Sequence, residues 1–259
     1  MRNTVSAWMA GIAAVLLGAA AHATAPVVRA AGMPTTREQT LARALPPAAN
    51  VAPAGASAGD GLRRAFTVGG FRSAYFGMDE EQVRAAISRD FGLPGESILV
   101  RDNKAEGTSV LIVRTPLPPG PGDALISYIL GATQHRLIHV NVMWAADAAA
   151  TPQTRQAMAN AGLQLARYFR RQGWPGASPI RTGLTSTGIL MFQATDAAGS
   201  SIAVEARGVA LVRKSDGGTQ TSKATGPAML RISFAQDSAH PDVSSGRQEL
   251  SGALPASQP

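Results

Sequence analysis

The chain has no cysteine among its 259 residues. This absence excludes disulfide bonds, zinc–thiolate and iron–sulfur sites, and catalysis by a cysteine nucleophile. It also excludes the lipid-bearing cysteine of a bacterial lipoprotein. A protein without these cross-links needs a hydrophobic core that is large enough to be stable by itself.

Recognisable catalytic motifs are also scarce. No segment matches a phosphate-binding loop, a dinucleotide fingerprint or a calcium loop, so we expect no cofactor. The G-x-S-x-G pattern around Ser57 lies in a linker-like segment, without the strand and helix that would expose a nucleophile. His135 and His139 are four residues apart in a strand-like run, which separates them by roughly 13 Å and does not suit one metal ion. We therefore expect no metal site, and we expect His139 to be a hydrogen-bonded sheet residue.

The first residues carry the pattern of an export signal. Arg2 precedes an apolar run over 7–21, and the small-residue motif A-H-A ends at Ala23. The apolar run is shorter than the roughly 20 residues that a membrane-spanning helix needs. Residues 1–23 are therefore predicted to be a signal peptide, and the mature protein is predicted to be periplasmic or secreted, without a transmembrane segment.

The charge balance is basic, with 24 Lys and Arg residues against 17 Asp and Glu residues and a net charge of +7. Because the chain is predicted to be exported, nucleic acid is not the expected partner. An envelope protein, an anionic envelope polymer or a lipid surface suits the charge better. The alternative is that the basic residues only solvate the surface.

Two segments are rich in alanine, proline and glycine and poor in large apolar side chains. Residues 24–61 and 238–259 bury too little apolar surface to offset the entropy of ordering, so both are predicted to be disordered. Between them, a predicted helix over 79–91 is followed by four strand-like runs, and a predicted helix over 152–171 is followed by three. The strand-like runs are 97–101, 108–114, 124–130 and 136–144, then 189–194, 201–213 and 228–235.

Sequential strands joined by short turns favour antiparallel hairpins over parallel crossovers. Residues 230–234 alternate between apolar Leu, Ile and Phe and polar Arg and Ser. This period of two predicts a sheet with one buried face and one wet face. The sequence thus predicts an α+β fold of two helix-plus-antiparallel-sheet halves packed together, 62–147 and 148–237, flanked by disordered termini.

The first predicted helix has clear start and stop signals. Asp79 is the expected N-cap, Gln82 completes a capping box, and Gly92 suits a left-handed stop. Asp90 interrupts the apolar face, and the sequence gives no reason for it. The apolar face consists of Val83, Ala86, Ile87 and Phe91.

The second predicted helix begins at Thr151 as cap and Pro152 as first helical residue, and Gly173 is expected to end it. Its apolar stripe consists of Met158, Ala161, Leu165, Tyr168 and Phe169. The opposite half of the helix carries Arg155, Arg167, Arg170 and Arg171. These arginines are predicted to face solvent together as a partner-binding strip, because each guanidinium offers a planar fork of donors to carboxylates or phosphates.

The segment "YFGMDEEQV", residues 75–83, resembles the entry to the first helix of the SmpA/OmlA-like domain of the outer-membrane assembly machinery. The order of a helix followed by hairpins is similar to the tandem fold of the secreted β-lactamase inhibitor protein. "GFRSAYFGM", "ISYILG" and "VNVMW" together resemble a group of uncharacterised exported proteins of alphaproteobacteria. These resemblances imply a binding or assembly module.

Together, the sequence features favour an exported, non-catalytic module that binds or assembles an envelope component. One alternative is a hydrolase or transferase that acts on envelope polymer through a carboxylate site not recognisable from sequence, and a second is a structural coat component. A glycosidase would need two carboxylates across a cleft, and sequence spacing does not show which acids lie close together.

Overall fold

The computed structural model describes residues 65–174, 179–210, 212–215, 218–221 and 224–244. The predicted signal peptide, the predicted linker and Ser57 lie outside the described residues. In the described ranges, no helix combines the length and apolar character needed to cross a membrane.

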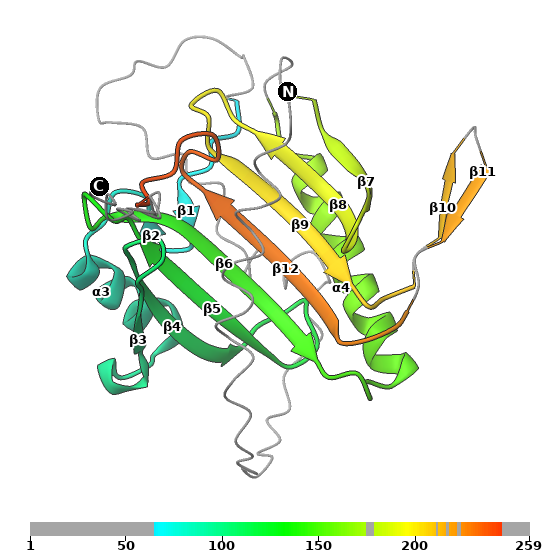
Figure 1. The fold of residues 1–259 in the computed structure, drawn as a ribbon, viewed down its shortest axis with the longest axis horizontal. Coiled ribbons are helices and arrows are strands. Elements are labelled where there is room, and N and C mark those ends of the chain that lie inside the picture. Colours follow the sequence, from blue (N-terminus) through cyan, green and yellow to red (C-terminus); the bar gives the residue numbers. More distant parts are fainter. Residues whose placement is uncertain (1–64, 175–178, 211, 216–217, 222–223, 245–259) are drawn as a thin grey trace, which may run out of the picture.

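The described chain has an α+β fold dominated by one antiparallel sheet of eight strands (Figure 1). The strand order is β3-β4-β5-β6-β12-β9-β8-β7. Two α-helices accompany it, α3 (Glu80–Phe91) and α4 (Pro152–Arg170). The sheet strands are β3 (Leu99–Asn103), β4 (Thr108–Pro116), β5 (Asp123–Leu130), β6 (Leu137–Ala146), β7 (Arg181–Thr185), β8 (Gly188–Thr195), β9 (Ser201–Arg207) and β12 (Ala228–Ala235). Smaller elements are the pair β1 (Gly70–Phe71) and β2 (Ala74–Tyr75), the 3₁₀ turn η1 (Gly95–Ser97), and the pair β10 (Val212–Ser215) and β11 (Gly218–Thr221).

The chain order explains the strand order. The strands β3 to β6 follow α3 as a series of antiparallel neighbours, and β7, β8 and β9 follow α4 in the same way. The last strand, β12, pairs with both β6 and β9 and so joins the two series into one sheet. The predicted antiparallel α+β class is confirmed, whereas the division into two halves stays a prediction.

Both helices lie on the same side of the sheet, behind it in the view of Figure 1. Ile87 of α3 and Leu165 of α4 belong to one buried cluster with Val142 of β6 and Ile232 of β12. Alternate side chains of these strands point to the opposite side, where no helix lies among the described residues. We call that side the helix-free face.

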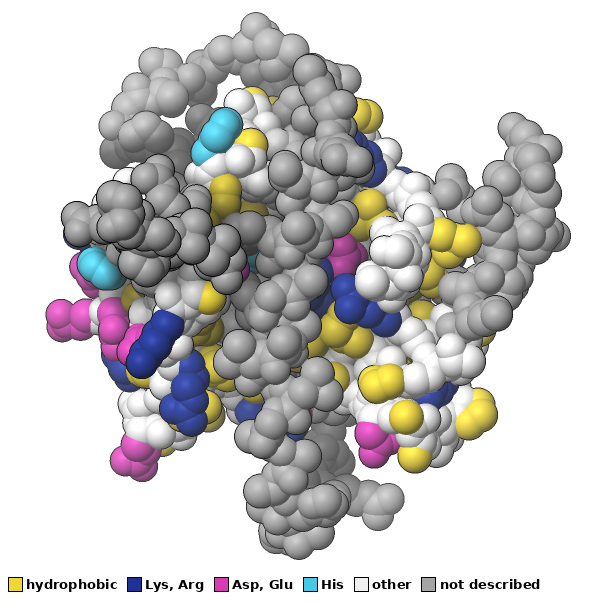
Figure 2. Space-filling model, in the orientation of Figure 1, with side chains coloured by type: hydrophobic (Ala, Val, Ile, Leu, Met, Phe, Trp, Pro, Cys, Tyr) yellow, Lys and Arg dark blue, Asp and Glu magenta, His cyan; other side chains and the backbone are white. Residues whose placement is uncertain are grey.

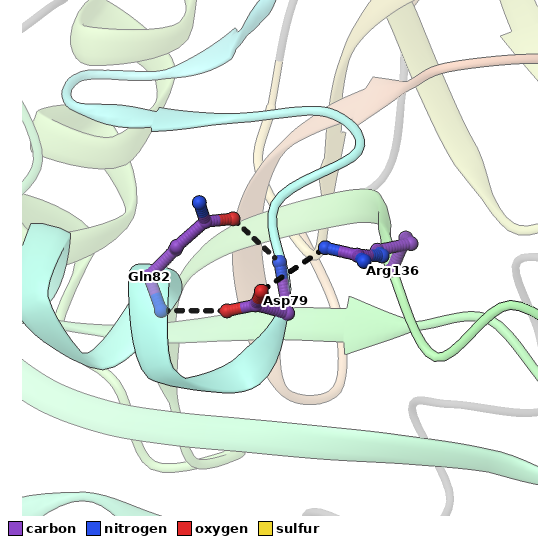
Figure 3. A network of polar contacts seen from close by, with 3 residues as sticks. All are labelled: Asp79, Gln82 and Arg136. Carbon is purple, nitrogen blue, oxygen red and sulfur yellow. Dashed lines mark hydrogen bonds and ion pairs between the residues drawn. The ribbon is translucent and has the colours of Figure 1, made fainter.

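The start of α3 follows the prediction. The Asp79 carboxylate accepts a hydrogen bond from the backbone N–H of Gln82 at 3.0 Å, and the Gln82 side chain accepts one from the Asp79 N–H at 3.0 Å. Figure 3 shows this reciprocal capping box and the ion pair of 3.0 Å between Asp79 and Arg136. Gly92 ends the helix in the left-handed region, with φ 64°. The capping box and the stop at Gly92 are therefore confirmed.

The unexplained Asp90 has a structural role. Its carboxylate accepts a hydrogen bond from the backbone N–H of Ser73 at 2.9 Å, and its backbone carbonyl accepts one from the Arg72 guanidinium at 3.1 Å. Arg72 has a positive φ of 54° in the tight connection between β1 and β2, and its guanidinium lies 4.7 Å from the Phe91 ring centroid. Asp90 therefore fastens this connection to the end of α3.

Helix α4 begins at the predicted cap, where the Thr151 hydroxyl accepts a hydrogen bond from the Thr154 N–H at 3.1 Å. It ends at Arg170, three residues before the predicted stop. Its predicted apolar stripe is buried except for Tyr168, which is half-buried. The Phe169 ring lies 5.9 Å from that of Phe192 and 6.3 Å from that of Phe234. These contacts hold α4 on β8 and β12.

The helix-free face differs from the wet face that the alternating pattern predicts. Arg231 is 5% exposed and Ser233 is 3% exposed, although both point away from the helices. The Arg231 guanidinium forms a 2.6 Å ion pair with Glu205 on the neighbouring β9, so its charge is compensated within the sheet. The prediction of a wet face is therefore wrong for these two residues.

The segment that follows β12 is more ordered than predicted. Residues 238–244 belong to the predicted disordered tail, yet the Ala132 N–H donates to the Asp242 carbonyl at 2.9 Å and the Ser244 N–H donates to the Glu106 carbonyl at 2.8 Å. Val243 packs on a small apolar cluster of the helix-free face that includes Ile129. The predicted start of the tail at residue 238 is too early, because these contacts order the segment across the sheet end.

Candidate functional site

A cavity of about 390 Å³ lies on the helix-free face, where β6 and β9 begin and β12 ends. Its floor is formed by side chains of these three strands, including His139, Ser201 and Ser233. The segment 236–242, which leaves β12 and turns back over the sheet end, provides a wall. The volume falls within the range of roughly 300–1,000 Å³ that is typical of small-ligand sites.

The floor contains a buried imidazole–hydroxyl pair. His139 Nε2 lies 2.6 Å from Ser233 Oγ, and the two residues are 94 positions apart in the sequence. Their strands β6 and β12 bring them together, since Ser233 pairs in register with Asn141, two residues beyond His139 on the same face. The prediction that His139 is a hydrogen-bonded sheet residue is confirmed.

The floor is electrically neutral near pH 7. The pKa of His139 is lowered to about 4, because burial disfavours the charged ring and the Arg231 cation repels it. A hydrogen bond with the Asn141 side chain offsets only part of this shift. Arg231 is itself paired with Glu205.

The wall of the cavity carries two carboxylates. Asp242 accepts hydrogen bonds from the backbone N–H groups of Gln134 at 3.0 Å and Thr133 at 3.1 Å. Asp237 accepts from the N–H groups of Ala239 at 2.8 Å and His240 at 2.9 Å. These backbone donors, led by His240 for Asp237 and by Gln134 for Asp242, lower the pKa of both carboxyl groups. Both acids therefore carry negative charge at neutral pH.

The arrangement suits binding better than covalent chemistry. Ser233 lies in the middle of β12, whose backbone is paired with β6 on one side and with β9 on the other. Its neighbouring N–H groups are therefore committed to the sheet and cannot form an oxyanion hole. Within the described residues, no group of three or more His, Asp or Glu side chains is placed to hold a metal ion.

The predicted arginine strip is only partly exposed. Arg155 is 9% exposed, and its guanidinium donates to the backbone carbonyls of Gly208 at 2.6 Å, Ala148 at 2.8 Å and Ala150 at 3.1 Å. The prediction that Arg155 faces solvent is wrong, because the chain before α4 and the chain after β9 both close over it. This arginine joins two loops to the helix.

The other three arginines remain on the surface. Arg167, Arg170 and Arg171 are exposed in the last turn of α4 and just beyond it. Figure 1 shows α4 behind the sheet, whereas the cavity is lined by side chains of the helix-free face. The structure thus separates the predicted basic strip from the cavity.

Charge on the helix-free face is mixed. Figure 2 shows Lys and Arg side chains in dark blue and Asp and Glu side chains in magenta on the visible part of this face.

Comparisons of the chain with protein-family models, with curated proteins and with solved structures found no match.

Proposed function

We propose that the protein is an exported, non-catalytic binding module that holds an envelope component at the cavity on its helix-free face. The observation that carries this proposal is the cavity itself, where three strands and the segment 236–242 enclose convergent polar side chains. A site of this volume with a few directed polar groups is the usual form of a ligand-binding pocket.

The state of the two cavity acids favours binding over the alternative of a carboxylate hydrolase acting at this cavity. A glycosidase needs one carboxyl group that stays protonated to act as general acid. The pKa values of Asp237 and Asp242 are both lowered, in each case because the carboxylate accepts backbone hydrogen bonds. These two acids order the segment after β12 and cannot supply that proton.

Filling the cavity is expected to reduce partner capture strongly. Ala235 lines the cavity at the end of β12 and is partly exposed, so Ala235→Trp blocks the space without crowding the core. Crosslinking and co-purification from the native periplasm should show about tenfold less of the captured component with this variant.

The matched control for this experiment is Ala145→Trp. Ala145 is exposed on the same face of the sheet, towards the opposite end of β6. This variant should capture the same component as the wild-type protein. Equal capture by Ala235→Trp and Ala145→Trp would contradict a binding role for the cavity.

We further propose that Arg167, Arg170 and Arg171 contact anionic envelope material, such as phosphates or carboxylates. Reversing two of these charges with Arg167→Glu and Arg170→Glu should leave the melting temperature nearly unchanged, because exposed charges contribute little to stability. Association with the isolated envelope fraction should weaken, and wild-type association should fall as salt is raised.

A control with the same change of net charge is Arg101→Glu with Arg114→Glu, which reverses two exposed arginines on β3 and β4. This variant should associate with the envelope fraction like the wild-type protein. If the envelope fraction retained both double variants equally, and if salt did not change this retention, the arginines of α4 would only solvate the surface.

We also infer that the fold consists of two related halves, 62–147 and 148–237. In support, α3 is followed by β3, β4, β5 and β6, and α4 is followed by β7, β8, β9 and finally β12. The first strand of each series lies at a sheet edge and the last lies at the centre. A module of this kind offers a broad sheet face to a partner.

A further inference from the structure

We propose that the cavity takes an aliphatic primary ammonium group, as carried by a lysine side chain of a partner or by a free diamine. This inference rests on the proposed binding function because it concerns the same cavity. It names the chemistry of the group that the cavity selects.

The charge of the cavity gives the first argument. Asp237 and Asp242 contribute two carboxylates, and no lysine or arginine belongs to the described residues that line the space. His139 on the floor is neutral because its pKa is lowered to about 4. The cavity is thus a negative site in a chain with a net charge of +7, so it attracts cations and repels carboxylates and phosphates.

The geometry of Asp237 gives the second argument. Its Oδ1 accepts the two backbone hydrogen bonds from Ala239 and His240. Its Oδ2 lies 3.4 Å from His240 Nδ1, and the His240 side chain is 87% exposed. An ammonium ion can therefore replace this weakly held imidazole at Oδ2 without disturbing the hydrogen bonds that fix the carboxylate.

The other residues that line the cavity suit the methylene stem of such a ligand. Ile138, Ala203 and Pro241 provide apolar surface for a methylene stem, and the Gln236 side chain adds a polar group at the wall. An ammonium group carries three donors and needs several acceptors around it. A charged head on a short apolar stem matches this distribution better than a planar or fully polar ligand.

The test is calorimetric titration of the purified full chain with 1,5-diaminopentane, with 1,5-pentanediol as the uncharged control of equal length. We expect the diamine to bind and the diol to bind at least about tenfold more weakly. Asp237→Asn should weaken diamine binding about tenfold, whereas Asp147→Asn, which changes an exposed acid near the start of α4, should not change it.

The source of the ammonium group is distinguished by titration with the tripeptide Gly-Lys-Gly. Binding of the tripeptide would indicate a lysine side chain of a protein, and binding of the diamine alone would indicate a free amine. Equal binding of diamine and diol, no binding of either amine, or unchanged binding by Asp237→Asn would overturn the inference. If no amine binds but Ala235→Trp still reduces partner capture about tenfold, the ammonium ligand is wrong and the binding function stands.

Discussion

Replacing Arg155 with alanine is expected to lower the free energy of unfolding by about 3 kcal/mol, because the three backbone carbonyl groups that it contacts lose a charged donor. The carbonyls of Ala148, Ala150 and Gly208 come from the chain before α4 and the chain after β9, so no other side chain in this arrangement satisfies all three. Urea denaturation followed by circular dichroism would measure the change.

Two further variants sharpen this experiment. Arg155→Lys should recover only part of the loss, because a lysine ammonium cannot reproduce the planar fork of a guanidinium. Arg170→Ala removes an exposed arginine of the same helix and should change the free energy by no more than about 0.5 kcal/mol. If Arg155→Ala and Arg170→Ala were equally stable, Arg155 would have no structural role.

Truncation of Ile87 in α3 should cost about 2–5 kcal/mol, as is usual for a buried isoleucine changed to alanine. Ile87 is fully buried in the cluster that joins α3 to the sheet, so the smaller side chain leaves a cavity there. Thermal and urea unfolding would both report the loss. Glu81→Ala, on the exposed side of the first turn, is the matched control and should have little effect. An unchanged unfolding midpoint for Ile87→Ala would mean that the buried face of α3 is wrongly assigned.

The local parts of the fold were predictable because their causes lie within a few residues. Asp79 and Gln82 make a capping box across one helical turn, and Gly92 supplies a conformation that other residues adopt at a cost. The existence of the strands was predictable in the same way, from the alternation of apolar and polar residues and from the short turns between the strands, such as residues 196–200 between β8 and β9.

Features that depend on distant segments were not predictable. The position of Arg155 on the helical wheel indicated exposure, but Gly208 arrives from beyond β9 to cover it. Asp90 seemed misplaced because its partner, the backbone of Ser73, belongs to the connection between β1 and β2. Helical periodicity describes a helix alone and contains no information on the loops that fold against it.

The cavity was missed for the same reason. His139 and Ser233 are separated by 94 residues, and only the pairing of β6 with β12 places them in contact. The alternating pattern did place Ser233 and Arg231 on one face of their strand. This was the signal in the sequence that pointed towards the cavity. No sequence pattern showed that the strand next to them would be β6, so no side chains could be assigned to a shared site.

The central position of β12 has a consequence for how the protein assembles. Hairpin contacts among β3, β4, β5 and β6 form between near neighbours in the chain, whereas β12 must close a long loop before it can pair with β6. Long-range pairing of this kind slows folding, because the entropy of loop closure is lost before the contacts form. Side chains of β6, β9 and β12 together form the floor of the cavity, so the site exists only after β12 has paired with its two neighbours. Ligand binding would therefore distinguish completely folded molecules from those in which only the first series of strands has formed.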